Sequence, residues 1–357
     1  MTSRAAPLPP PEADSGAQYL DRLEQAFHAA TRRVGVVERD HEIGGRRLRL
    51  RFAGGGLVPF LTPALAHLRA SRPAPADLTV CIWDSASTGI LPPACPWTPA
   101  GAFGEARIVV DNWQGVEFVA FPHGEEIDVL DRTRGLGLHF LGGAHPTAGP
   151  QSSLPLLTVL DWWLAERDLQ CVHAAAVGLE SGGVLLAGRG GSGKSTTALA
   201  CLRSPLRYLA DDYCLLSVAG APHAHALYSS GKLAPSQLER LSFLAPPEAP
   251  SVPCVDKEVV FLARAFPEKL LPGFPIRAVL ALRITGRAGT SLAAVSPGEA
   301  MKALAPSSLF QLGGARQRRL HAIATLVRTV PCYRLELGTE LEAIPGVILD
   351  LLSGAGA

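Results

Sequence analysis

Apolar positions repeat at helical spacing in several segments of the chain. The first stripe predicts a helix over residues 18–33. Its members are Tyr19, Leu20, Leu23, Phe27 and Ala30. Further helices are predicted over 57–70, 154–168, 296–305 and 315–329. Ser296 followed by Pro297 is typical of a helix start, because serine caps free backbone N–H groups and proline has none to satisfy.

Alternating apolar and polar positions predict strands in the first part of the chain. Residues 41–52 (HEIGGRRLRLRF) predict a hairpin that turns at Gly44-Gly45. A buried strand is predicted over 77–84, and short β-branched and aromatic runs over 105–142 predict a meander. These patterns indicate a β-rich α+β domain.

Beyond Cys171 the pattern changes to short apolar strands, a glycine-rich turn and helices, as in an α/β domain. Late strands are predicted over 277–285 and 332–337, and the best domain boundary is the loop 142–153. The predicted organisation is a disordered tail over 1–17, an α+β domain over 18–150 and an α/β domain over 151–357.

Composition narrows the classes of partner. Lys and Arg number 33 and Asp and Glu number 32, so the formal charge is +1. This balance gives no overall field that favours nucleic acid or an anionic membrane, and recognition of an anion has to be local. We therefore expect no nucleic-acid partner and no membrane partner.

The N-terminal segment and the cysteines indicate a cytoplasmic protein. The segment MTSRAAPLPPPEADSG lacks the apolar core of a signal peptide, and no apolar run approaches the roughly 20 residues that span a bilayer. The 7 cysteines are scattered and form no CxxC pair, which argues against a zinc site or a disulfide framework. Buried reduced thiols are the expectation.

Residues 188–195, GRGGSGKS, match the phosphate-loop pattern GxxxxGK[ST] in full. An apolar strand precedes the loop and a helical pattern follows it, which is the context that this motif requires. The glycines allow the backbone N–H groups to curl toward an anion, and the helix start adds a positive dipole end. The residues expected to bind the nucleotide are Gly188, Arg189, Gly190, Gly191, Ser192, Gly193, Lys194, Ser195 and Thr196.

Two residues of this loop have predicted chemical roles beyond binding. Lys194 is expected to reach the β- and γ-phosphates of ATP as a point charge and to act in catalysis. The Ser195 hydroxyl is expected to ligate Mg²⁺, which prefers oxygen ligands. The predicted cofactors are ATP and Mg²⁺.

An acidic pair follows the loop at short range. The apolar strand in LRYLADDYCLL (206–216) delivers Asp211 and Asp212. Neighbouring strand residues point to opposite faces, so one carboxylate should face the loop unless a bulge intervenes. One would bind Mg²⁺, and the other would accept a proton from an attacking hydroxyl. A solvated strand end is the alternative.

His173, in CVHAAAV, is expected on a strand that neighbours the loop. By itself, a histidine among apolar residues is typical of a packed core.

His173, the Gly188–Ser195 loop and the Ala210-Asp211-Asp212 strand together resemble the HPr serine kinase/phosphorylase family. The resemblance covers residues 171–216. It implies a P-loop core with a mixed sheet similar to phosphoenolpyruvate carboxykinase. It also implies that Asp211 is the catalytic base, that His173 lies close to that base, and that Asp212 helps to hold the metal.

The chain also departs from that family. The Glu-Ile-Arg-Gly-Leu-Gly signature of the bifunctional members does not follow the acidic pair, so phosphorylase activity is not implied. The chain is more similar to divergent HPr-kinase-like proteins that accompany gene clusters for ribosomally made peptides. The implied partner is a protein or peptide acceptor, and a homo-oligomer is compatible because HPr kinases form hexamers.

The sequence thus predicts a Mg²⁺-dependent kinase for a serine hydroxyl of a protein or peptide, with the acceptor bound by residues 18–150. A small-molecule hydroxyl kinase, a nucleotide-driven ATPase or switch, and a binding scaffold without turnover are the alternatives. Lys232 and Lys257 are candidate phosphate contacts or surface lysines. The arginines at 316, 318 and 319 are interpreted as a solvent-exposed helix face, and the acids at 125, 126 and 131 as ordinary charged residues of a hairpin.

Overall fold

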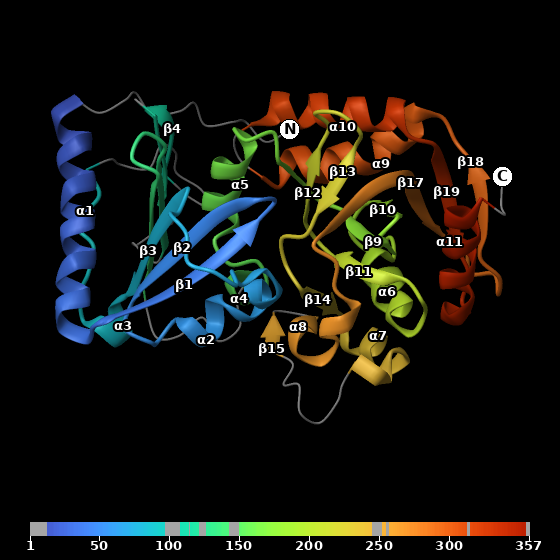
Figure 1. Cartoon of the computed structure of the whole chain (residues 1–357), viewed down its shortest axis with the longest axis horizontal. Coiled ribbons are helices and arrows are strands. Elements are labelled where there is room, and N and C mark those ends of the chain that lie inside the picture. The colour runs from blue at the N-terminus through green and yellow to red at the C-terminus, as the bar shows by residue number, and fades with distance from the viewer. Residues whose placement is uncertain are drawn as a thin grey trace. The chain divides into compact units, whose positions relative to one another are not determined.

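The computed structural model describes residues 13–96, 108–113, 115–120, 126–142, 150–244, 252–254, 257–312 and 315–354. These residues form a mixed α/β chain with a seven-stranded, a nine-stranded and a three-stranded sheet (Figure 1). The chain divides into two compact units. The first comprises Met1–Leu61, Arg69–Pro146 and Leu156–Trp163, and the second comprises Thr62–Leu68, Thr147–Pro155 and Leu164–Ala357. The domain boundaries predicted from the sequence stay predictions.

The first unit is built around the seven-stranded sheet, in the order β1-β2-β3-β7-β6-β5-β4. Its strands are β1 Val36–Ile43, β2 Arg46–Ala53, β3 Leu78–Asp84, β4 Ile108–Trp113, β5 Val116–Ala120, β6 Glu126–Asp131 and β7 Leu136–Leu141. β3 pairs in parallel with β2 and β7, whereas the other neighbours are antiparallel. The predicted hairpin is confirmed, since Ile43 pairs with Arg46 across the two glycines.

Helix α1, Ala13–Val34, contributes the first apolar stripe to the core of this unit. The Phe27 ring lies 6.2 Å from the Trp83 ring of β3, centroid to centroid. The predicted tail over 1–17 needs a correction, because residues 13–17 are already helical. Helix formation is cooperative, so a stripe anchored in a core extends the helix toward its N-terminus.

The helix predicted over 57–70 forms as two short pieces. Helix α2 covers Val58–Leu61, and a 3-10 helix covers Pro63–Leu68. Pro63 has no N–H group to continue α2, and its ring excludes an uninterrupted α-helix at this point.

The second unit contains the nine-stranded sheet, which runs β11-β9-β10-β17-β13-β12-β8, with β19 joined to β17 and β18 joined to β19. Its strands are β8 Gln170–Val172, β9 Ala175–Leu179, β10 Gly182–Ala187, β11 Arg207–Ala210, β12 Cys214–Ser217, β13 His223–His225, β17 Gly273–Ile284, β18 Ser291–Ala294 and β19 Cys332–Leu337. β10 pairs in parallel with β17 and antiparallel with β9, so the sheet is mixed, as expected.

Helices pack against this sheet from several parts of the chain. Val184 and Leu186 of β10 share a buried cluster with α6, Lys194–Ala200, and α11, Ile344–Ser353. Helices α9, Pro297–Phe310, and α10, Arg316–Thr329, lie side by side (Figure 1), and α9 also contacts β10, β17 and β19.

The remaining elements are short. They are strands β14 Ser230–Leu233, β15 Val252–Cys254 and β16 Lys257–Phe261, and helices α3 Ser85–Thr88, α4 Pro150–Ser153, α5 Leu157–Ala165, α7 Pro235–Arg240 and α8 Leu262–Ala265. Strands β14, β16 and β15 form the three-stranded antiparallel sheet.

One arginine of α10 is buried, although the sequence predicted a solvent-exposed helix face there. Arg316 and Arg318 are exposed, but Arg319 is fully buried. Its Nη1 donates to the backbone oxygen of Ser308 at 3.2 Å. Arg319 therefore joins α10 to α9 instead of facing solvent.

Candidate functional site

The glycine loop, residues 188–193, connects the end of β10 to the start of α6. Gly191 and Gly193 have φ angles of 78° and 94°, in the left-handed region that favours glycine. At Gly188 an added Cβ would lie 2.3 Å from Ser192 Oγ, so a side chain does not fit there. The sequence pattern thus reflects a real steric requirement of this turn.

Lys194, the first residue of α6, is 7% exposed and turns back over the loop. Its Nζ donates to the backbone oxygen of Gly188 at 2.8 Å and to that of Arg189 at 3.4 Å. Burial lowers the pKa of Lys194, and the charges of Asp212 and Asp211 oppose that shift. The ammonium group thus lies within the loop, in the electrostatic field of both carboxylates.

Asp211 follows the last residue of β11 and is 2% exposed. Its Oδ2 accepts a hydrogen bond from Lys232 N at 2.8 Å. Burial and then the charge of Asp212 raise the pKa of Asp211 from 3.8 to about 6, although the nearby Ser195 side chain and the bond from Lys232 work in the opposite direction. The other carboxylate oxygen of Asp211, Oδ1, is buried and has no hydrogen-bond partner among the described residues.

Asp212 has two ionisable partners. His173 Nε2 lies 2.7 Å from Asp212 Oδ1, and Lys232 Nζ lies 3.0 Å from Asp212 Oδ2. Burial disfavours the charged form of Asp212, but the hydrogen bond from His173 and the charge of Lys232 outweigh it and lower the pKa. Asp212 is therefore ionised at neutral pH.

His173 lies directly after β8 and is held by its backbone and by its ring. Its N–H donates to Ser308 Oγ at 2.9 Å, and its ring lies 5.3 Å from the Tyr213 ring. The resemblance implies a histidine next to Asp211, whereas the structure pairs His173 with Asp212. β11 ends at Ala210, so the strand pleat, from which the orientation of the acidic pair was expected, does not govern Asp211 and Asp212.

Most of these groups line one cavity of about 380 Å³. Its lining includes the loop and helix residues from Gly190 to Thr197, and also Asp212, His173 and Lys232. The structure thus brings most of the predicted site residues together. Lys257 also lines the cavity, whereas Asp211 is not part of the lining.

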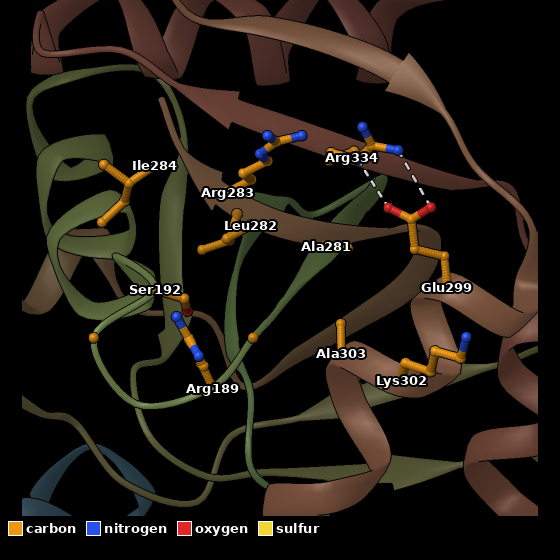
Figure 2. Close-up of a pocket in the computed structure, with 12 residues that line it drawn as sticks. Arg189, Ser192, Ala281, Leu282, Arg283, Ile284, Glu299, Lys302, Ala303 and Arg334 are labelled. Atoms are coloured by element: carbon orange, nitrogen blue, oxygen red, sulfur yellow. Dashed lines mark hydrogen bonds and ion pairs between the residues drawn. The ribbon is translucent and has the colours of Figure 1, made fainter. Parts of the chain in front are cut away.

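Gly188 and Arg189, both predicted nucleotide contacts, line a different cavity of about 750 Å³. Figure 2 shows this second cavity, with side chains from the loop, from β17, β19 and α9 around it. Gly191, Ser192 and Ile284 line both cavities, so the two adjoin at the glycine loop.

Several residues that line the smaller cavity were missed by the sequence reasoning. Gln237 and Arg240 come from α7, and Leu337 and Thr339 come from the end of β19 and the residues after it. Arg240 Nη2 donates to the backbone oxygen of Thr339 at 2.8 Å, which joins the two segments. No motif marks these positions, and the pairing of distant elements brings them to the loop.

The first unit contains another histidine–carboxylate cluster. Glu126 and Asp128 of β6 and His139 of β7 each offer a ligand atom, all within 4.8 Å of one another, so together they could hold a metal ion. His139 Nδ1 and Asp128 Oδ1 already lie 2.6 Å apart and are hydrogen-bonded. Asp131, interpreted as a hairpin charge, accepts bonds from Thr133 N and Arg134 N in the β6–β7 turn.

No helix within the described residues combines the length and the apolar character needed to cross a membrane.

Comparisons with known proteins add little to this geometry. No protein-family model and no curated protein matches the chain. Among solved structures, the Hpr(Ser) kinase/phosphatase from Coxiella burnetii is similar with a TM-score of 0.28 and 10% identity, over 52% of this chain and 95% of that chain. At this TM-score the likeness supports neither fold nor function, so function has to be inferred from the side chains themselves.

Proposed function

We propose that this chain is a Mg²⁺-dependent kinase that transfers the γ-phosphoryl group of ATP to a serine hydroxyl of a protein or peptide. The observation that carries the proposal is the convergence of the glycine loop, Lys194, Asp212, His173 and Lys232 on one cavity. A glycine loop alone would support only phosphate binding. A carboxylate and cations beside it are what phosphoryl transfer requires, because catalysis there consists of positioning and of stabilising charge.

In this proposal the glycine loop acts as a P-loop for the phosphates of ATP. The positive φ angles of Gly191 and Gly193 allow consecutive N–H groups to point toward one anion. Lys194 exchanges its bonds to Gly188 and Arg189 for phosphate oxygens. Because its ammonium group is largely buried, its charge acts through a medium of lower dielectric constant than water.

The residues around Ser195 fit a Mg²⁺ ion. Ser195 offers a hydroxyl, and Asp211 offers a buried carboxylate oxygen, Oδ1, that has no hydrogen-bond partner among the described residues. Both donors are oxygen, the ligand that this ion prefers. When bound, Mg²⁺ supplies positive charge beside the transferred phosphoryl group. A cation here would also offset the burial that raises the pKa of Asp211.

We assign the proton transfer to Asp212. Asp212 lines the cavity, so its carboxylate can reach a hydroxyl bound there, as a base has to. His173 and Lys232 hold the two carboxylate oxygens in place. This assignment exchanges the two roles that the resemblance implies, in which Asp211 is the base and Asp212 holds the metal. Binding of the acceptor by residues 18–150 stays a prediction.

The proposal is tested with the full chain, ATP, Mg²⁺ and a library of serine-containing peptides. We expect phosphoserine in the library by mass spectrometry and a nucleotide affinity that falls by about tenfold or more in Lys194→Ala. Lys269→Ala is the matched control, since Lys269 Nζ also donates to a backbone oxygen, that of Ser204 at 2.7 Å, but does not line the cavity.

Two results would contradict the proposal in different ways. If ADP forms without any phosphorylated acceptor, the chain is an ATPase or switch. If calorimetry detects no nucleotide binding to the wild-type chain, the glycine loop does not act as a P-loop and the kinase assignment is wrong.

A further inference from the structure

The larger cavity beside the glycine loop shares two loop residues with the proposed phosphate site, but neither Lys194 nor the acidic pair lines it. It measures about 750 Å³, within the range of about 300–1,000 Å³ that is usual for ligand sites. Ala281, Leu282 and Ala303 supply an apolar part of its lining, and charged side chains surround them (Figure 2). We call it the basic cavity, because of its charge.

Four cations from four elements line the basic cavity (Figure 2). They are Arg189 of the glycine loop, Arg283 of β17, Lys302 of α9 and Arg334 of β19. Glu299 is the one acidic residue of the lining, so four cations and one anion give a formal charge of +3. Glu336 lies just outside the lining, 3.9 Å from Arg283 and 3.8 Å from Arg334, and reduces this charge without cancelling it.

The four cations differ in how closely an acidic side chain already pairs with them. Glu299 holds Arg334 with two hydrogen bonds, at 2.8 and 3.3 Å. The Arg283 side chain is 63% exposed, and its ion pair within the described residues is the long contact to Glu336. Across the described part of the chain, the side chains of Arg189 and Lys302 form no hydrogen bond or ion pair. Arg189, Arg283 and Lys302 therefore remain able to bind an anion.

We propose that the basic cavity binds an acidic segment of the acceptor, which makes carboxylate-rich peptides the substrate class of this kinase. The proposal rests on the function proposed above. Ser192 and Gly191 line both cavities, so a segment bound here lies next to the phosphate loop. An acidic acceptor and a triphosphate repel each other, and cations placed around the acceptor offset that repulsion.

The test measures binding to the full chain by fluorescence anisotropy, with labelled hexaglutamate as the probe and hexaglutamine as its uncharged match. Each titration is run with and without Mg²⁺ and a non-hydrolysable ATP analogue. We expect hexaglutamate to bind at least about tenfold tighter than hexaglutamine, and the difference to shrink as salt is added. Lys302→Gln and Arg283→Gln should each weaken hexaglutamate about three- to tenfold, while Lys302→Arg retains the affinity.

Lys269→Gln is the control variant, because Lys269 is a lysine outside both cavities, and it should leave hexaglutamate binding unchanged. Equal binding of the two peptides, or unchanged binding in Lys302→Gln and Arg283→Gln, overturns the proposal. Serine phosphorylation without an acidic preference would leave the kinase intact and remove the role of the basic cavity. Hexaglutamate binding that depends on Lys302 in a chain that binds no nucleotide would remove the kinase and retain an anion site.

Discussion

Two histidine–aspartate pairs, one in each unit, have nearly the same geometry and different surroundings. His139 Nδ1 lies 2.6 Å from Asp128 Oδ1, and His173 Nε2 lies 2.7 Å from Asp212 Oδ1. The side chains of the first pair are 1% and 2% exposed, whereas those of the second are 8% and 25% exposed. The pair alone therefore does not define a functional site, and access for a ligand is what separates the two.

The two pairs also differ in their other neighbours. Asp128 and His139 are directly opposed residues of β6 and β7, so the sheet register holds the first pair. Burial disfavours the charged ring of His139, but the charges of Asp128 and Glu126 outweigh it and raise the pKa. Asp212 instead has Lys232 as a second partner and faces the cavity. We expect the pair of His139 and Asp128 to stabilise the fold, and the pair of His173 and Asp212 to contribute to phosphoryl transfer.

The largest expected effect is that of Asp212→Asn on turnover. If Asp212 accepts the proton of the acceptor, phosphoserine formation should fall by a factor on the order of 10² to 10⁴, because the amide is not a base. Its partly exposed ion pair should contribute less than about 1 kcal/mol to stability. Initial rates and urea unfolding measure the two effects. An unchanged rate in Asp212→Asn combined with a large loss in Asp211→Asn would restore the roles that the resemblance implies.

The next effect is on stability in the first unit. Asp128→Ala leaves a buried ring nitrogen without its partner and should lower the free energy of unfolding by about 3 kcal/mol. The raised pKa of His139 means that this stabilisation is complete below the unfolded value of 6.5 and is lost as the pH rises through the folded value. Urea unfolding at several pH values measures it. Asp128→Asn, whose amide oxygen still accepts a bond, should lose less, and an equal loss would contradict the role of the hydrogen bond.

Asp211→Asn, in the absence of Mg²⁺, should raise the free energy of unfolding, by less than Asp128→Ala lowers it. The folded-state pKa of Asp211 is raised from 3.8 to about 6, so ionisation destabilises the folded chain as the pH rises through this window. The amide avoids that loss and should stabilise the chain by about 2 kcal/mol at pH 7, with the gain fading toward pH 4. Thermal unfolding against pH measures it. A variant that is less stable at pH 7 would show that the hydrogen bonds of Asp211 outweigh its burial.

The smallest expected effect on the transfer rate separates the two lysines, Lys232 and Lys257, that line the smaller cavity. Lys232 is 12% exposed and contacts Asp212, so Lys232→Met should lower the transfer rate by about tenfold. Lys257 is exposed, so water screens its charge, and Lys257→Met should change the rate by less than about threefold. Initial rates at saturating ATP measure both, and equal losses would place Lys257 closer to the transferred group than its exposure indicates.

Local patterns predicted much of the fold. The hairpin that turns at Gly44-Gly45, the strands of the meander and the strand–loop–helix around residues 188–195 are confirmed, because each depends on residues close together in sequence. The break at Pro63 in the helix predicted over 57–70 also has a local cause, which the spacing of apolar residues does not indicate.

Partners that come from distant elements could not be predicted in the same way. Lys232 reaches Asp212 because β14 passes beside the end of β11, and no periodicity encodes that approach. The resemblance implies that His173 lies close to Asp211, but it does not indicate that the bond of the ring goes to the adjacent Asp212. Arg319 is buried because Ser308 of α9 accepts its hydrogen bond, which the composition of α10 does not indicate.

The position of the Lys194 ammonium group has a consequence for ligand design. Because this group is already satisfied by the backbone oxygens of Gly188 and Arg189, any phosphate must displace internal acceptors before it gains the lysine. An analogue that also offers hydrogen-bond donors to those two released oxygens would recover that loss. Such a compound would replace the hydrogen bonds that Lys194 makes to the backbone. It should bind with a more favourable enthalpy than ATP.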